Sequence, residues 1–317
     1  MNHEEREKWL AERKTGIGAS EVAGILGLSP WDNPVSIWAR KKNLVPEKPD
    51  SLRFKVGRKM EGPIAELYAE RAGVQLVKPV ELFRHETHPL LGTPDRLVAG
   101  KEVGVEIKTV DPSQEHQWGE DGSDEIPLYY VTQVASYMAL TGYGIWDVAV
   151  LFGLYDFRVY RLVRDLDLER MLLNRVSDFW RRYVVGNEEP ELDGSEESAA
   201  YLAQKYPANR KPMLTATPEG DQLFLTVAEL QREYNEKGVR YEHGKNLLKQ
   251  EIGGADGLVS TFGKVYWKTS KPIEVVDWKG VAEELIGPDV PKVLVEKYTH
   301  TRPGSRRFIL YPNRHNT

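Results

Sequence analysis

The 317-residue sequence predicts an α/β protein with a smaller α+β extension after it. Segments with a strand pattern, at residues 92–110, 145–153 and 157–163, alternate with helical patterns at 128–142 and 166–184, as in a βαβ-type core. The composition then turns acidic and loop-like, and prolines punctuate the chain that follows. We therefore predict a first domain at residues 1–205 and an accessory domain at 206–317.

The composition excludes several kinds of protein. The chain has no cysteine, which excludes disulfides, thiolate zinc sites and iron–sulfur clusters. No apolar run is long enough to span a bilayer, and the charged N-terminus is unlike a signal peptide, so we expect a cytoplasmic protein and no membrane partner. His85 and His88 have no obvious third ligand and are expected to be ordinary surface histidines.

Charge divides unevenly along the chain, whose formal net charge is −5. Residues 1–205 hold 26 lysines and arginines against 34 acids, and residues 206–317 hold 17 against 14. The last seventeen residues hold four arginines and no acid. With Tyr266, Trp267 and Trp278 among lysines, this region suits contact with single-stranded DNA, but also a docking surface or an ordinary small core.

The N-terminal region predicts a charged helix at 3–13 and a short helix at 22–26 that Ser20 caps. Arg13 and Ser20 would then lie near a helix N-terminus, whose free N–H groups attract anions. This arrangement is either a phosphate pocket or a simple capped helix. Gly16 and Gly18 match no nucleotide-binding loop, so we expect no ATP.

Helices are expected next at 34–43 and 62–72. Pro63 suits a first helical turn and Gly73 a helix end, which leaves Glu61 just before the second helix. Four cations precede Glu61 and either steer phosphates or form a solvated face; they are Arg53, Lys55, Arg58 and Lys59. Residues 74–84 then have the pattern of a strand.

A hairpin at residues 92–110 carries the clearest chemical signal. Asp95 ends one extended segment, and residues 99–101 have turn chemistry. On the next strand Glu106 and Lys108 are two residues apart and therefore share a face. Two carboxylates suit Mg²⁺, and a lysine can hold a water beside it, as in a hydrolytic site for phosphodiesters. The same charges could also be an ordinary solvated strand face.

Beyond the hairpin, a polar loop leads to the helix at 128–142, where Gln133 and Tyr137 are four residues apart and share a face. After the predicted boundary, residues 222–252 form a long polar helix or a helical pair broken at Gly238 or Gly244. Residues 257–272 and 306–312 alternate like strands of a small sheet.

Several segments taken in order resemble the λ-type (YqaJ-like) phage exonucleases, a branch of the PD-(D/E)XK nuclease superfamily. The resemblance covers residues 9 to about 185 and is carried by WLAERKTGIGASE, GRKME, GTPD, VEIK and YYVTQVASYM. It implies a restriction-endonuclease-like core, in which helices flank a mixed central sheet. It says little about residues after 206.

The resemblance also implies roles for matching residues. Asp95, Glu106 and the carbonyl of Ile107 would hold Mg²⁺ or Mn²⁺, and Glu61 would be a further acidic ligand or would hold a water. Lys108 would position the attacking water. The helix residue Gln133 would belong to the catalytic site. DNA contacts would come from Arg13 and Ser20 on a 5′-phosphate, with Arg58 and Tyr137 nearby.

The implied function is a Mg²⁺-dependent deoxyribonuclease, and most specifically a 5′→3′ exonuclease on double-stranded ends that works beside a strand-annealing protein in phage-type recombination. If a phage encodes it, it would act in the host cytoplasm. The family also implies a ring-forming homotrimer. Two alternatives remain: an endonuclease on the same core, and a non-catalytic scaffold that binds DNA ends.

Overall fold

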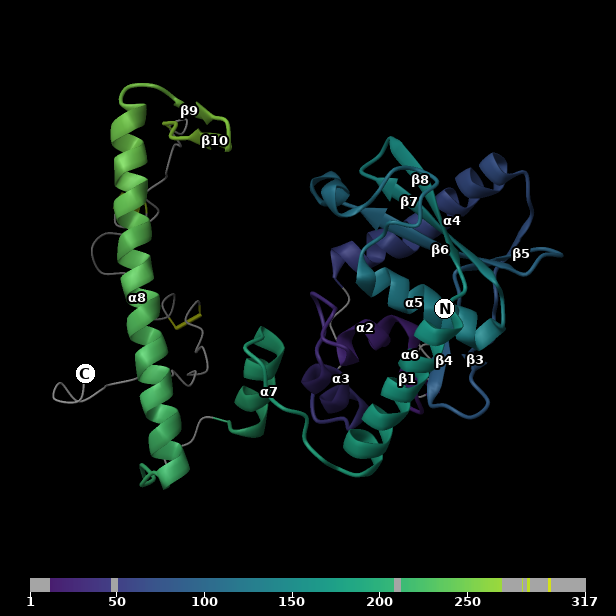
Figure 1. Cartoon of the computed structure of the whole chain (residues 1–317), viewed down its shortest axis with the longest axis horizontal. Helices are drawn as coiled ribbons and strands as arrows, with labels where there is room; N and C mark the ends of the chain where they lie inside the picture. The colour runs from purple at the N-terminus through teal and green to yellow at the C-terminus, as the bar shows by residue number, and fades with distance from the viewer. Residues whose placement is uncertain are drawn as a thin grey trace. The chain divides into compact units, whose positions relative to one another are not determined.

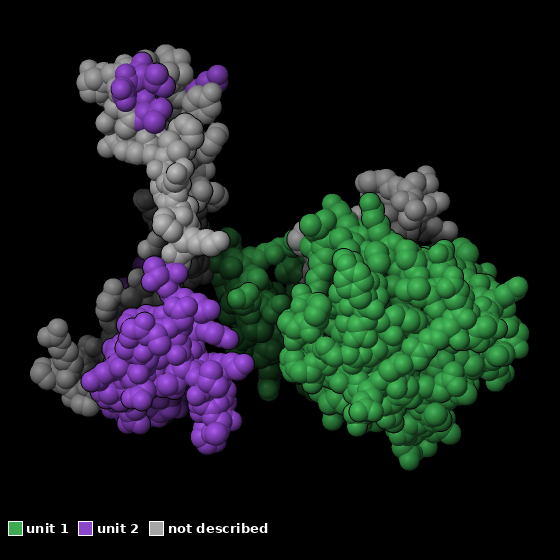
Figure 2. Space-filling view, turned by 90° about the horizontal axis from the view of Figure 1, so that it is seen from above, with its two compact units in different colours: residues 1–207 green, residues 208–317 purple. Residues whose placement is uncertain are grey.

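A computed structural model describes residues 12–46, 51–207 and 212–269, with 281, 284–285 and 296–297 as isolated short pieces. Residues 3–11 of the helix expected at 3–13 lie outside the described residues, as do the strand expected at 306–312, Trp278 and the basic tail. The chain divides into two compact units, residues 1–207 and 208–317, which Figure 2 colours separately. Each unit is described by itself below.

A five-stranded mixed sheet is the centre of the first unit (Figure 1). Its strand order is β2-β5-β6-β7-β8. The β6–β7 pair is parallel and the other pairs are antiparallel. The strands span Leu76–Val77, Arg96–Val98, Val103–Val110, Ile145–Phe152 and Asp156–Val163. The expected α/β class with a mixed central sheet is confirmed.

Helices cover both faces of this sheet. Helix α4 (Leu52–Ala72) packs on one face through Ile64 and Tyr68, in a cluster with Val105. Helix α5 (Leu128–Thr141) packs on the other face. Because α5 lies between the parallel strands β6 and β7 in sequence, it is the crossover connection that such a pair requires.

A second, three-stranded sheet corrects the expectation of one strand at 74–84. That segment contributes two strands of two residues each to different sheets: β2 joins the central sheet, whereas β3 (Phe83–Arg84) pairs with β4 (Leu90–Gly92). Strand β1 (Ile17–Gly18) pairs in parallel with β4 on its other side. The N-terminal segment is therefore tied to the chain just before Asp95.

Helix α4 is longer than predicted, since it begins at Leu52 and runs for 21 residues. The Ser51 side chain caps it by accepting a hydrogen bond from the N–H of Phe54. Pro63 is therefore inside the helix, and Glu61 is part of it. A proline in a helix interior is costly, so the buried residues that follow it must hold the helix on the sheet.

The prediction that Ser20 caps a helix is wrong. Ala19–Glu21 form a 3-10 turn, and helix α2 (Val22–Ile25) follows directly. The Glu21 carboxylate instead accepts the N–H of Gly18 at 2.7 Å. Helix α3 follows at Pro34–Lys41 and has an Asn33 cap.

Several shorter elements complete the first unit. A 3-10 helix (Pro112–Gln117) occupies part of the polar loop, and α6 (Leu166–Phe179) continues as a π-helix at Trp180–Val185. Sequence reasoning missed α7 (Glu196–Lys205), whose N-cap is Ser195.

Gly104 provides space for a stack of rings between β6, β7 and α5. It lies opposite Trp146 in the parallel register, and an added Cβ would come within 2.4 Å of the indole ring. That ring stacks on Tyr137 of α5, with centroids 5.4 Å apart and planes 13° apart. On another side of Tyr137, a Cβ at Gly92 would approach the ring to 2.8 Å. The two glycines thus allow Tyr137 to pack closely.

In the second unit, α8 (Pro218–Ile252) is one continuous helix of 35 residues. A break at Gly238 or Gly244 is therefore wrong. Strands β9 (Gly257–Ser260) and β10 (Gly263–Tyr266) form an antiparallel hairpin after it. Within the described parts of both units, no helix is long and apolar enough to cross a membrane.

Candidate active site

All ten residues to which the resemblance assigns a role line one cavity of about 690 Å³ in the first unit. They come from the N-terminal segment, α4, the β5–β6 hairpin and α5, so residues more than 100 positions apart meet there. The ten are Arg13, Ser20, Arg58, Glu61, Asp95, Glu106, Ile107, Lys108, Gln133 and Tyr137.

The hairpin places its two carboxylates beside the lysine. Asp95 accepts a hydrogen bond from the N–H of Ile107 at 2.8 Å, which fixes its side chain against β6. Glu106 is 2% exposed, and its Oε1 accepts from Lys108 Nζ at 2.5 Å and from Gln133 Nε2 at 2.7 Å. Its Oε2 is buried and has no hydrogen-bond partner among the residues that the structure describes. Such an orphaned oxygen is costly unless a cation or water satisfies it.

The charges of this group are unbalanced. Burial and the nearby Glu106 carboxylate raise the pKa of Asp95 to about 8. Burial acts to lower the pKa of Lys108, but Glu106 and Asp95 outweigh it, so the pKa of the ammonium lies above its ordinary value. One lysine therefore faces two acidic side chains that resist carrying negative charge together, and a divalent cation would stabilise the charged form of both.

Glu61 does not complete a cluster of three acids. Its carboxylate pairs with Lys78 Nζ at 3.3 Å, although it also borders the cavity. Over the described residues, no three histidine, aspartate or glutamate side chains are grouped as a metal site would require. Among the acidic side chains, the structure brings Asp95 and Glu106 together beside Ile107, and the role expected of Glu61 stays a prediction.

Helix α5 supports this pair from the other side. Gln133 bonds to Glu106 and lies 3.3 Å from Lys108 Nζ through its Oε1. The Tyr137 hydroxyl donates a hydrogen bond to the Thr93 carbonyl at 3.3 Å, and the residue as a whole is only 6% exposed. Tyr137 therefore braces the helix against the segment before Asp95, and its buried position does not suit the DNA contact expected of it.

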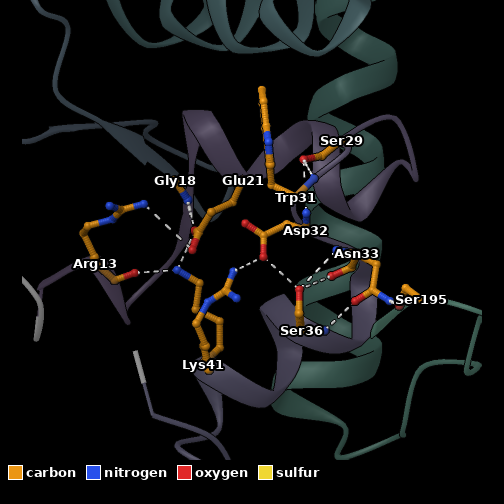
Figure 3. A network of polar contacts seen from close by, with 11 residues as sticks. Arg13, Gly18, Glu21, Ser29, Trp31, Asp32, Asn33, Ser36, Lys41 and Ser195 are labelled. Carbon is orange, nitrogen blue, oxygen red and sulfur yellow. Dashed lines mark hydrogen bonds and ion pairs between the residues drawn. The ribbon is translucent and has the colours of Figure 1, made fainter. Parts of the chain in front are cut away.

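A cationic group forms another part of the cavity wall (Figure 3). Buried Glu21 lies 2.6 Å from Lys41 Nζ and 3.9 Å from the Arg13 guanidinium. Burial acts to raise the pKa of Glu21, but Lys41 and Arg13 outweigh it and the pKa is lowered. Lys41 also donates to the Arg13 carbonyl at 2.9 Å. Two cations thus lie around one carboxylate, and the exposed Ser20 lines the same cavity.

Sequence reasoning missed Arg40 and Lys41, which close α3 and reach this cavity. Arg40 pairs with Asp32 at 2.7 Å. Asp32 also accepts a hydrogen bond from the Ser36 hydroxyl at 2.9 Å (Figure 3). The available signal was the pair of basic residues in the last turn of a helix that is otherwise mostly apolar.

Helix α4 places only part of its basic run at the cavity. Arg53 and Arg58 line it with Glu61, whereas Lys55 and Lys59 do not. Arg58 and Glu61 are three residues apart, and Arg53 precedes Glu61 by eight residues, or about two turns, so all three lie on one side of the helix. The separation could not be read while the helix was expected to begin at residue 62.

Comparisons with known proteins give two matches in sequence. Residues 8–144 match the family description "YqaJ-like viral recombinase domain". Over 308 residues the chain is 30% identical to the Bacillus subtilis (strain 168) protein described as "Uncharacterized protein YqaJ". The alignment covers 94% of this chain and 92% of that protein.

Two solved structures are also similar. One is LHK-Exo in complex with dAMP, at 20% identity and a TM-score of 0.48, covering 63% of this chain and 97% of that one. The other is an alkaline exonuclease (LHK-Exo) from Laribacter hongkongensis, at 20% identity and a TM-score of 0.47, covering 57% and 93%. From its identity to the Bacillus subtilis protein over nearly the full length of both, the chain belongs to the YqaJ-like viral recombinase family.

Proposed function

We propose that this chain is a DNA exonuclease that uses Mg²⁺, or Mn²⁺ in its place, to hydrolyse phosphodiesters from double-stranded ends in the 5′→3′ direction. Membership of a viral recombinase family supports DNA as the substrate. The observation that carries the proposal is the buried Glu106, one oxygen of which has no partner in the described part of the chain. It lies beside Asp95 and Lys108 at the wall of a cavity rich in cations.

The donor set fits a divalent cation. Asp95 and Glu106 would hold it with the Ile107 carbonyl. Hard cations prefer oxygen ligands, and Lys108 alone does not balance the charge of two carboxylates. A bound Mg²⁺ would supply Lewis-acid stabilisation of the charge that develops on the phosphodiester oxygens.

Lys108 and Gln133 would do the remaining work near the reacting phosphate. The Lys108 ammonium is fixed by Glu106 at 2.5 Å and by Gln133 at 3.3 Å, so a water that it binds is held at a defined place. Gln133 also donates to Glu106, which keeps that carboxylate turned to the cavity. Positioned groups of this kind lower the barrier because their geometry is set before the reaction.

The cationic group of Arg13 and Lys41 supports action at DNA ends. A terminal phosphate carries more negative charge than an internal phosphodiester, and the group offers two cations for one carboxylate. Ser20 adds a hydroxyl donor at the same wall. A pocket that holds the terminal phosphate would fix the distance to the bond that is cut.

The direct test is digestion of end-labelled linear duplex and covalently closed circular DNA, with Mg²⁺ and with EDTA. We expect mononucleotides from 5′-phosphorylated linear DNA in Mg²⁺ only, and intact circles. Arg13→Ala should lower the preference for 5′-phosphate over 5′-hydroxyl ends. Lys59→Ala is the control, because it also removes one positive charge but Lys59, on α4, does not line the cavity. Cleaved circles would favour an endonuclease, and DNA binding without cleavage would favour a scaffold.

We assign the second unit an accessory role in DNA grip or assembly. Residues 206–317 carry 17 basic against 14 acidic side chains, while the whole chain is acidic and has no overall attraction to DNA. A homo-oligomeric ring, or docking of a strand-annealing protein, would keep such a chain on its substrate. Light scattering of the full chain with and without duplex DNA tests the ring.

A further inference from the structure

A second cavity of about 550 Å³ adjoins the candidate active site. It shares part of its wall with the first cavity, through Ser29, Trp31, Arg53, Tyr129 and Tyr130. The proposed mechanism uses none of these five residues.

The shared wall is a continuous row of aromatic rings. Trp31 meets Tyr129 edge-on with centroids 5.1 Å apart, and Tyr129 meets Tyr130 at 4.5 Å. The ring of Tyr130 in turn lies 5.4 Å from that of Trp118, which is buried in the hydrophobic cluster between α5 and the sheet. The row is therefore anchored at one end and open at the other.

Cations lie against this row at two places. The Arg53 guanidinium lies 5.9 Å from the centroid of Trp31, and Lys108 Nζ lies 4.9 Å from that of Tyr130. The second contact connects the row to the proposed catalytic lysine. A ligand that spans the wall would thus meet aromatic faces and positive charge together.

Trp31 is 42% exposed, and in Figure 3 its ring projects away from the ion pairs around Lys41. A single exposed tryptophan is common on proteins. This one differs because it belongs to the row and because polar side chains line the other part of the second cavity. Gln114 and Gln117 are hydrogen-bonded there at 2.7 Å, and the Tyr129 hydroxyl lies 3.4 Å from Gln117.

We propose that the second cavity is a nucleobase subsite, in which Trp31 and Tyr129 stack against a base next to the phosphodiester that is cut. The inference rests on the proposed nuclease function. A nucleotide combines a flat π-face, a polar edge and a negative phosphate, which match the rings, the glutamines and the two cations. Because every base has a π-face, this subsite would position a strand with little regard to its sequence.

The test compares duplexes whose cleaved strand carries a normal base, or an abasic residue, at the first, second or third nucleotide from the 5′ end. Single-turnover rates are measured for the unmodified full-length chain, Trp31→Ala and Trp31→Phe. Tyr155→Ala is the control, since Tyr155 is an exposed aromatic in the β7–β8 turn, outside both cavities.

Stacking on one aromatic contributes about 1–3 kcal/mol per base. The single-turnover rate of the unmodified chain should therefore be roughly 5- to 150-fold lower on one of the abasic duplexes than on the normal duplex. Trp31→Ala should show that loss on the normal duplex and little further loss on the abasic one. Trp31→Phe should retain most of the discrimination, and Tyr155→Ala all of it.

Two outcomes separate the inference from the function on which it rests. If the unmodified chain degrades normal and abasic duplexes equally at all three positions, there is no base subsite, although the nuclease stands. The same conclusion follows if folded Trp31→Ala discriminates as the unmodified chain does. If the unmodified chain degrades neither duplex in Mg²⁺, the proposed function itself fails.

Discussion

Replacement of Asp95 by asparagine should stabilise the metal-free protein, and the gain should grow with pH. Asparagine keeps an oxygen that can accept the N–H of Ile107, but it removes the charge that Glu106 and burial oppose. The Glu106–Lys108 pair that remains is electrically balanced. Loss of a charged active-site group often increases stability in this way.

The size and sign follow from the pKa of Asp95, which rises from 3.8 to about 8. The folded state holds a proton that the unfolded chain releases, so this group makes the wild-type protein less stable as pH rises from about 4 to 8. At about 1.36 kcal/mol per unit, the ceiling is roughly 1.5 kcal/mol at pH 5 and roughly 5 kcal/mol at pH 8. Because Asp95 is half-buried at a cavity wall, water screens part of this unfavourable electrostatic energy. We therefore expect the stability advantage of Asp95→Asn to grow by about 2–3 kcal/mol between pH 5 and pH 8.

The assay is urea unfolding of both proteins in EDTA at pH 5, 6, 7 and 8. The difference between the two free energies of unfolding cancels the titration of all other groups. A difference that stays constant with pH, or that favours the wild type more strongly at pH 8, would show that the charge of Asp95 does not destabilise the folded protein. It would also remove the electrostatic reason for a cation at this site.

Three further predictions concern other parts of the chain. Lys108→Ala should lower the single-turnover cleavage rate roughly a hundredfold or more while DNA affinity in a gel-shift assay changes little, and a normal rate would contradict the assigned role. Asp147→Ala should cost about 2–4 kcal/mol in urea unfolding, because it leaves the Tyr68 hydroxyl without its 2.6 Å partner and removes both bonds to Arg161; a loss under 1 kcal/mol would contradict this. A chain ending at Pro207 should remain folded by circular dichroism and cleave DNA in Mg²⁺ with fewer nucleotides removed per binding event, whereas an insoluble product would show that the two units fold together.

The sequence was most informative where one local pattern decides the structure. The β5–β6 hairpin follows from turn residues between two extended segments, and Gly100 has the positive φ of 70° that its turn requires. Helix α5 follows from apolar spacing and from Gly142, which ends it in the left-handed conformation. The chemistry of Asp95, Glu106 and Lys108 could be read for the same reason, since strand alternation fixes which side chains share a face.

Prediction was poorer where distant contacts override a local preference. Pro63 suggested a helix start, but burial of Ile64 and Tyr68 on the sheet carries α4 through it. The missed signal was Ser51, a good N-cap directly before the true start. Ser20 was assigned a cap because its type favours one, whereas the longer side chain of Glu21 reaches back to Gly18.

The glycine at position 104 limits how this protein can be redesigned. The ring of Trp146 fills the place where a side chain would stand, and through Tyr137 this packing reaches Gln133, which holds Glu106. Even one added methyl group would therefore be transmitted as a displacement of the helix, since close-packed interiors pass strain on rather than absorb it. Mutant libraries that aim to change substrate preference should leave this column untouched and vary the cavity rim, where a new side chain has only solvent to displace.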